Sequence, residues 1–206
     1  RNADEASPQA LVAQLDRLRR ALAIDRWHLC GHSFGAGLTL RYALDFPDHC
    51  RGHVFTNANA ALRGALASGE RAAYAVQLAE LRAEGASALM RMRYHPRHAR
   101  GLDPTLRADL IADVDRVDPE GFALLLAYTL PHLSVRDRLP ALRVPTLLVN
   151  GLRERRFQPL RVWLQQARPG IGIVDLDGGH SINLDCAAGF NEAVRQFLGP
   201  GVVEPL

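Results

Sequence analysis

A serine flanked by glycines stands where an apolar run gives way to a helical pattern. The stretch at 27–37 reads WHLCGHSFGAG, and its segment Gly31–Gly35 fits the pattern G-x-S-x-G. Such a pattern suits a sharp strand-to-helix turn that holds the serine in a strained backbone conformation with its hydroxyl exposed. We expect glycine at both flanks because a side chain there would collide with the adjacent strand and helix. Ser33 is therefore a candidate nucleophile at a helix N-terminus, where backbone N–H groups favour negative charge. The alternative is a hydroxyl that only caps the helix.

A serine nucleophile needs a base, and the base needs an orienting acid. The chain offers both in the order serine, acid, histidine. Glu154 lies in VNGLRERRF and His180 lies in LDGGHSINL, each just after an apolar run. Both are expected at the carboxyl ends of strands, the edge where open α/β sheets place their ligand sites. The alternative for Glu154 is a surface ion pair with one of the arginines beside it.

The elements that must position these residues alternate between helical and strand patterns, which is typical of an α/β sheet with crossover helices. Helices are expected at 7–23, 33–45, 159–168 and 186–198, and strands at 27–31, 53–57, 144–151 and 171–178. The first helix begins with Ser7 as N-cap and Pro8, and it carries an apolar face of four leucines. These leucines are Leu11, Leu15, Leu18 and Leu22.

The middle of the chain is rich in alanine, leucine and arginine and has helical spacing without a convincing strand. We therefore divide the chain into a core at 1–59, a helical insertion at 60–142 and the rest of the core at 143–206. Some larger side chains of the insertion suit either an acyl pocket or a helix-packing core. These are Met90, Met92, Phe122 and Tyr128.

Composition narrows the classes of function. The 206 residues are 48% hydrophobic, which is enough for one compact core. The net charge is only +3, every cation is an arginine, and the arginines form no block, so nucleic-acid binding has little support. No apolar run is long enough to span a membrane, and the three cysteines are unpaired by spacing. We expect buried free thiols and a cytoplasmic protein.

Two histidines, His95 and His98 in RYHPRHAR, raise the question of a metal site. Pro96 disrupts a helical pairing of the two rings, and no cysteine or carboxylate stands near at ligand spacing. We therefore expect no metal, and the chemistry outlined above needs no cofactor.

The sequence resembles the α/β-hydrolases with a helical cap, a group that includes esterases, lactonases and carbon–carbon bond hydrolases. The resemblance is carried by GHSFGAG with RYALDFPD behind it, by RVPTLLVNGLRE, and by GGHSINLDCAAGFNEAVRQFL, and it extends from Ser7 to Leu198. It implies a mostly parallel sheet of about four strands, helices on both faces, and a triad of Ser33, His180 and Glu154.

The chain departs from that family in two respects. The family usually has aspartate where Glu154 stands, and Asn57 occupies a region where some relatives place the acid, although a neutral amide cannot stabilise an imidazolium as a carboxylate does. The family's strands before the serine turn and its early His-Gly loop have no counterpart here. If the sequence is a piece of a longer protein, we expect it to retain one oxyanion donor, the N–H of Phe34, and to leave the strand before the serine turn as an exposed sheet edge.

These observations predict a serine hydrolase that cleaves a carboxylic ester, lactone, thioester or activated carbon–carbon bond of a small acyl substrate. His32 and Phe34 flank the nucleophile and are expected to line the substrate pocket. Two alternatives use the same fold. One is a non-catalytic small-molecule receptor, which would tolerate loss of Glu154. The other is an acyltransferase with the same triad. The substrate and the oligomeric state stay open.

Overall fold

The computed structural model describes residues 2–66, 68–92, 95–99 and 102–199. The chain divides into two compact units. The helical unit comprises Arg1–Ala10 and Ala65–His132, and the sheet unit comprises Leu11–Gly64 and Leu133–Leu206. The outer limits of the predicted core segments, residue 1 and residues 200–206, lie outside the described residues. Among the described residues, no helix is long and apolar enough to cross a bilayer.

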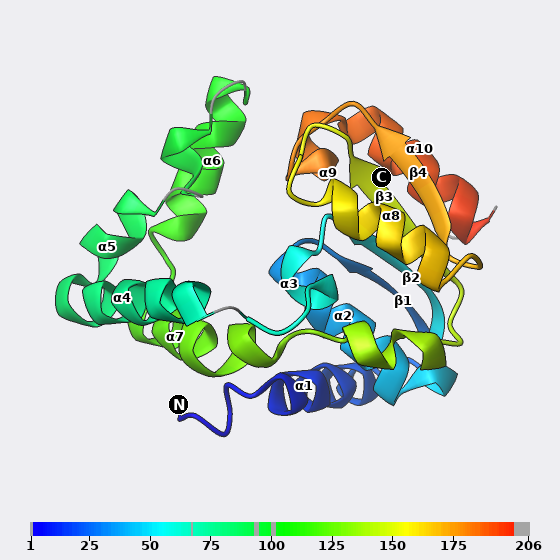
Figure 1. Ribbon diagram of the computed structural model, residues 1–206, viewed down its shortest axis with the longest axis horizontal. Helices are drawn as coiled ribbons and strands as arrows, with labels where there is room; N and C mark the ends of the chain where they lie inside the picture. Colours follow the sequence, from blue (N-terminus) through cyan, green and yellow to red (C-terminus); the bar gives the residue numbers. More distant parts are fainter. Residues whose placement is uncertain (1, 67, 93–94, 100–101, 200–206) are drawn as a thin grey trace. The chain divides into compact units, whose positions relative to one another are not determined.

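The sheet unit contains four parallel strands in the order β1-β2-β3-β4 (Figure 1). The strands are β1 (Trp27–Gly31), β2 (Cys50–Thr56), β3 (Thr146–Gly151) and β4 (Gly172–Leu176). The predicted α/β class and strand number are confirmed. β2 begins at Cys50, before the predicted residue 53, because Arg51 and Gly52 interrupt the apolar pattern at its start. β1 forms one edge of the sheet, as expected.

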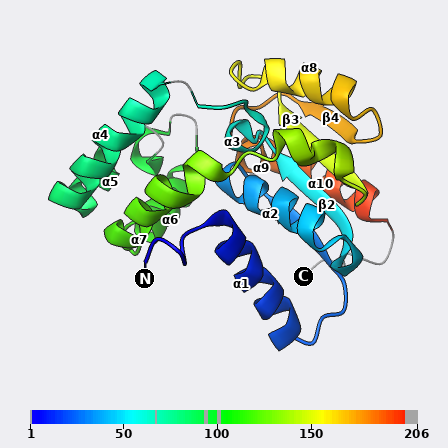
Figure 2. The same ribbon diagram turned by 60° about the horizontal axis from the view of Figure 1, so that its bottom comes forward.

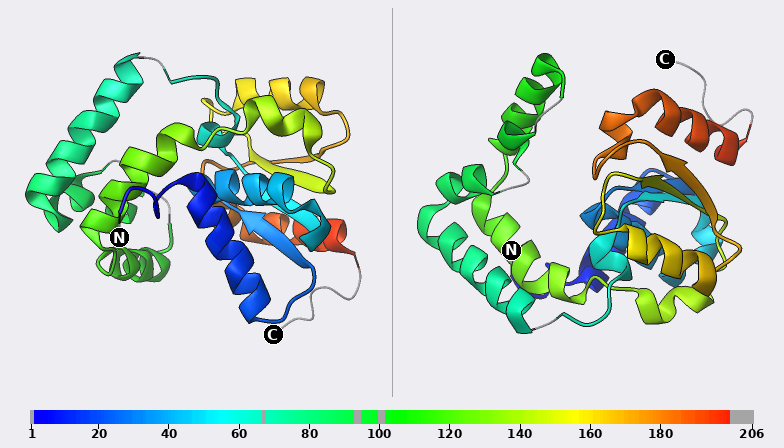
Figure 3. Two further views of the ribbon diagram at one scale, coloured as in Figure 1. Left: turned by 90° about the horizontal axis from the view of Figure 1, so that it is seen from below. Right: turned by 45° about the horizontal axis from the view of Figure 1, so that its top comes forward.

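Helices cover both faces of the sheet. Side chains alternate between the faces of a strand, so neighbouring residues of β2 belong to different clusters. Phe55 packs in the larger cluster with α1, α2 and α8, whereas Val54 packs against residues of α9 and α10. Figure 3 shows the red helix α10 on one side of the strands and the yellow helix α8 on the other. The helices of this unit are α1 (Pro8–Ala21, shared with the helical unit), α2 (Phe34–Asp45), α3 (Asn59–Leu62), α8 (Gln158–Ala167), α9 (Ile182–Asp185) and α10 (Ala187–Leu198).

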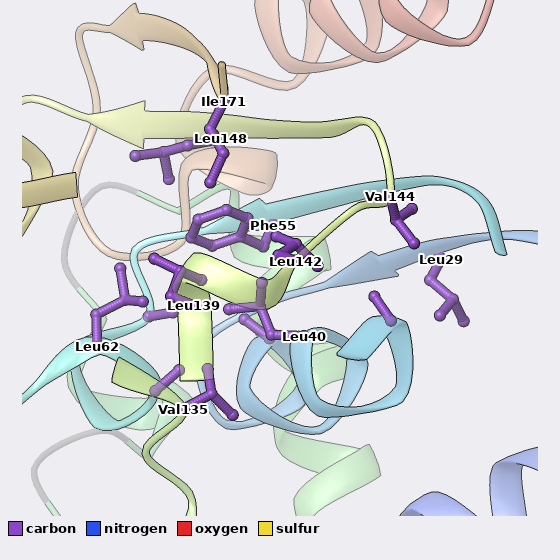
Figure 4. Close-up of a cluster of buried hydrophobic side chains, with 14 of the residues drawn as sticks. Leu29, Leu40, Phe55, Leu62, Val135, Leu139, Leu142, Val144, Leu148 and Ile171 are labelled. Carbon is purple, nitrogen blue, oxygen red and sulfur yellow. The ribbon is translucent and has the colours of Figure 1, made fainter. Parts of the chain in front are cut away.

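The larger cluster forms the core beneath the serine turn (Figure 4). Leu40 of α2, Phe55 of β2 and Leu148 of β3 are each fully buried in it. Leu139, in the 3-10 segment Arg136–Ala141, belongs to the same cluster. This packing fixes α2 against the sheet and so fixes the position of the turn that precedes α2.

The buried face of α1 differs from the predicted one. Ser7 caps the helix through its hydroxyl, which accepts from the Ala10 N–H, as expected. However, Leu18 and Leu22 are 50% and 57% exposed. The buried residues of α1 are Pro8, Val12, Asp16 and Arg19, and of the predicted face Leu15 packs half-buried against the core. Asp16 accepts a hydrogen bond of 3.0 Å from Tyr42 Oη of α2, which lies beside α1 (Figure 2). A buried polar network, which periodicity of apolar residues cannot reveal, therefore decides the orientation of this helix.

The helical unit includes Ala65–His132, the central part of the segment 60–142 predicted as an insertion, whereas residues 60–64 and 133–142 belong to the sheet unit. Its helices are α4 (Ser68–Glu84), α5 (Ala86–Arg91), α6 (Pro104–Val114) and α7 (Pro119–Leu124), followed by a π-helical turn at Leu125–Thr129. Asp103 and Asp118 cap α6 and α7 by accepting backbone N–H bonds. Met92 and Phe122 pack against the buried core of this unit, while Met90 and Tyr128 are partly exposed.

The three cysteines are free thiols, as expected. Cys50 is buried and Cys186 is half-buried, but Cys30 is exposed, so the expectation that all three are buried is wrong for Cys30. Cys30 lies on the edge strand β1, where the described residues provide no further strand to cover it.

Candidate functional site

Ser33 lies in the turn between β1 and α2 with φ 51° and ψ −111°. This positive φ is a conformation that side chains other than glycine rarely adopt, so the turn is strained as the motif predicts. The Ser33 side chain makes no capping hydrogen bond to α2. Its Oγ lies 2.8 Å from His180 Nε2. The capping alternative therefore does not describe this serine.

The two glycines of the motif have different roles. A Cβ at Gly31 would stand 2.2 Å from Thr39 Oγ1 and 2.6 Å from Ala36 Cα, so only glycine fits there. A Cβ at Gly35 would meet no heavy atom within 4 Å. The expected collision at Gly35 is therefore wrong, because Gly35 already belongs to the first turn of α2 and faces open space. Gly37 permits close packing, since a Cβ there would lie 2.4 Å from Leu133 Cγ.

His180 lies in the loop between β4 and α9 and joins the serine to the acid. Its Nδ1 lies 2.9 Å from Glu154 Oε1. A carboxylate only accepts hydrogen bonds, so Nδ1 carries the hydrogen and Nε2 accepts from the Ser33 hydroxyl. The loop is held by the Gly179 N–H, which donates to Asp185 Oδ2 at 2.7 Å.

Glu154 lies in the turn after β3, and its side chain is only 14% exposed. Its Oε1 accepts from Asn59 Nδ2 at 2.7 Å as well as from His180, while Oε2 is buried without a partner in the described part of the chain. Burial acts to raise the pKa of Glu154, but His180 and the amides of Asn57 and Asn59 outweigh it, so the pKa lies below its usual value. Arg153 pairs with Asp177 instead, so the described contacts of Glu154 are not those of a surface ion pair with Arg153.

Asn57 connects the two loops that carry the acid and the base. It is fully buried just beyond β2, where its Oδ1 accepts from the Gly151 N–H at 2.9 Å. Its Nδ2 donates to the carbonyl oxygens of Gly151 and Gly179, each at 3.3 Å. These loops approach so closely that a Cβ at Gly151 would lie 2.1 Å from the Gly179 oxygen. Asn57 thus occupies the region where some relatives place an acid, but here its amide joins the two loops through hydrogen bonds.

His32 and Phe34, the residues on either side of Ser33, also lie at this site. The His32 Nε2–H donates to the His180 carbonyl oxygen at 3.1 Å, and the two rings lie 5.0 Å apart. Loss of hydration and the nearby His180 ring lower the pKa of His32. Phe34 is the first residue of α2, so its N–H lies among those that the helix itself does not pair. An oxyanion formed at Ser33 would meet this N–H and the positive end of the helix.

The histidines of the helical unit have other partners. His95 Nδ1 accepts from the Arg97 N–H, and the His98 Nε2–H donates to the Met90 carbonyl oxygen. Among the described residues, no group of three or more histidine, cysteine or acidic side chains is arranged to hold a metal ion.

Comparison with known proteins shows the family of the chain. Residues 7–186 match the sequence model of the alpha/beta hydrolase fold, and the chain belongs to this family. A probable proline iminopeptidase from Leptolyngbya boryana is 43% identical over 44 residues, which are 21% of this chain and 14% of that protein.

Two solved structures illustrate the shared fold. The enol-lactonase from Burkholderia xenovorans superposes with a TM-score of 0.75 at 23% identity, covering 93% of this chain and 73% of that one. An esterase from Exiguobacterium antarcticum superposes with a TM-score of 0.79 at 16% identity, covering 96% and 75%. At these identities the likeness concerns the fold.

Proposed function

We propose that this chain is a serine hydrolase that cleaves a carboxylic ester, lactone, thioester or activated carbon–carbon bond through Ser33, His180 and Glu154. The observation that carries the proposal is the continuous hydrogen-bond chain from Ser33 Oγ through the two nitrogens of one imidazole to a buried carboxylate. A capping serine or a structural histidine does not require this order of partners. Esterase and lactonase structures of the same fold support the choice of acyl chemistry.

In the proposed reaction, Ser33 Oγ attacks the substrate carbonyl carbon while His180 Nε2 takes the hydroxyl proton. The new C–O bond places negative charge on the carbonyl oxygen, which the Phe34 N–H binds. Glu154 stays ionised and stabilises the imidazolium. The intermediate then collapses, the bond to the leaving group breaks, and His180 delivers its proton to that group.

The second half of the reaction repeats these steps with water. His180 accepts a proton from water as the water oxygen attacks the acyl-enzyme carbonyl. Collapse of the second intermediate returns the proton to Ser33 and releases the acid. No cofactor is needed, and His32 and Phe34, which flank the nucleophile, are the proposed substrate-facing residues. The proposed partner is a small acyl molecule.

The proposal is tested by treating the purified chain with a fluorophosphonate and locating the adduct by peptide mass spectrometry. We expect modification at Ser33 that is lost in His180→Ala. Ser33→Ala should lower turnover of p-nitrophenyl acetate by about 10⁶-fold, because the triad acts as a unit. An unmodified Ser33 in a folded chain would contradict the proposal and favour the receptor alternative.

A further inference from the structure

Asn59 is the first residue of the short helix α3 and has no part in the steps above. β2 and β3 are parallel neighbours, so the loops after them meet at one edge of the sheet. This places the Asn59 amide against the acid, with Nδ2 donating to Glu154 Oε1 at 2.7 Å. The same oxygen accepts from His180 Nδ1 at 2.9 Å. One carboxylate oxygen thus receives two donors from two different loops.

We propose that Asn59 is a positioning residue that holds Glu154 Oε1 in place for His180. This inference rests on the proposed function and names a residue needed for it. Glutamate has one more rotatable bond than aspartate, so its carboxylate can occupy more positions. The other oxygen, Oε2, is buried and has no partner in the part of the chain that the structure describes. The Asn59 amide therefore distinguishes the two oxygens and fixes the direction of the carboxylate.

The support beneath Asn59 is rigid enough for this task. Its neighbours Ala58, Ala61 and Leu62 are fully buried in the core of the sheet unit. The Arg63 N–H donates to the Asn59 carbonyl oxygen at 3.0 Å and closes the single turn of α3. A donor held by a packed core keeps its geometry while charge moves between the other groups. As a neutral amide, Asn59 also stabilises the charged form of Glu154 without competing for its proton.

The first test replaces Asn59 with leucine, which has a similar size and no donor. We expect kcat on p-nitrophenyl acetate to fall about 10- to 100-fold, because small misplacements of reacting groups have effects of this order. KM should change little, because Asn59 acts through Glu154. In Glu154→Gln, the added leucine should cause no further loss of kcat. A loss that persists in the Glu154→Gln background, or an Asn59→Leu enzyme with the kcat of the parent, would overturn the inference.

The second test replaces Asn59 with aspartate, which has nearly the same shape. Two carboxylates this close repel when both are ionised, so the pair should hold one shared proton to a higher pH than a single carboxyl group does. The parent enzyme should keep its kcat/KM as the pH rises above neutral. Asn59→Asp should instead lose activity at higher pH, when the shared proton leaves and the two carboxylates repel. A profile of the same shape as the parent's would overturn the inference.

A third measurement does not depend on turnover. The His180 Nδ1 proton should give a far-downfield proton NMR signal because it lies in a hydrogen bond to a carboxylate. Asn59→Leu should move this signal or broaden it through exchange with water, with circular dichroism reporting that the fold is retained. An unchanged signal in a folded variant would overturn the role of Asn59. If the parent chain takes up no fluorophosphonate, the proposed function fails, while this signal still decides whether Asn59 orients the acid.

Discussion

Ser33 adopts a backbone conformation that typically costs about 1–3 kcal/mol, and two side chains behind the turn help the fold hold it. Thr39 Oγ1 lies 3.1 Å and 3.2 Å from the carbonyl oxygens of Gly35 and Ala36, to which it donates. The same hydroxyl then accepts from the Nε2–H of His53 at 2.9 Å. A fully buried histidine of β2 is thus connected to the first turn of α2, directly beneath the nucleophile.

His53 makes the stability of the sheet unit depend on pH. Burial lowers the pKa of His53 to about 3, whereas the unfolded chain titrates near its ordinary 6.5. Because the folded-state pKa is the lower one, the contribution of His53 to stability is complete above the unfolded pKa and is lost as the pH falls toward the folded pKa. Between pH 7 and pH 5 the free energy of unfolding should fall by about 2 kcal/mol through this group.

Chemical denaturation at several pH values would measure this effect. His53→Gln, which does not titrate in this range, should lose less stability than the parent over the same interval. Other ionisable groups contribute to both proteins, so the difference between the two slopes reports His53. Equal slopes in two folded proteins would contradict the prediction. If the glutamine variant does not fold, the ring carbon shifts of His53 in the parent should still show no titration above pH 5.

β1 and α2 pack so closely around Ser33 that one glycine of the turn has no room for a side chain, whereas the other has room for one. Gly31 at the end of β1 touches α2 at Ala36 and Thr39, whereas Gly35 within α2 faces open space. The pentapeptide motif makes these glycines look equivalent. In the structure the two glycines differ, because only the first, Gly31, lies where the strand packs closely against the helix that follows it.

Gly31→Ala and Gly35→Ala form a matched pair. Gly31→Ala should destabilise the protein by about 1–3 kcal/mol and slow fluorophosphonate labelling of Ser33, because the new Cβ must displace the backbone of α2. Gly35→Ala should keep the labelling rate and gain up to about 1 kcal/mol from helix propensity. Thermal unfolding and labelling kinetics measure both effects. Equal behaviour of the two variants would contradict this division of roles.

The sequence predicted the position of a residue at this edge of the sheet where that position depends on a single strand and the turn after it. Ser33 follows from the turn motif, and Glu154 and His180 follow from their places after strands. The hydrogen-bonding role of Asn57 and the presence of Asn59 at the site escaped prediction, because their partners lie in other loops and periodicity says nothing about which loops touch. The orientation of α1 escaped for a similar reason, since its buried Asp16 has its partner on α2.

At the scale of the whole molecule, the order of the four strands leaves β1 as one edge of the described sheet. An edge strand presents unpaired backbone groups that can template association with another chain. β1 reads WHLCG and has no lysine, arginine, aspartate or glutamate, the charged side chains by which many natural edges discourage pairing, and its fourth residue, Cys30, is exposed. Ser33 lies in the turn that follows this strand, so pairing of β1 with another chain would also affect the turn that holds the nucleophile.

Cys30→Lys should therefore reduce self-association. A lysine on the edge opposes strand pairing between copies through charge repulsion and the cost of desolvation. Gln14→Lys, at an exposed position of α1, adds the same charge away from the edge and serves as the control. Light scattering at increasing protein concentration should rise more slowly for Cys30→Lys than for Gln14→Lys, while fluorophosphonate labelling of Ser33 reports that the turn is retained. Equal scattering by the two variants would mean that net charge, and not the β1 edge, governs association.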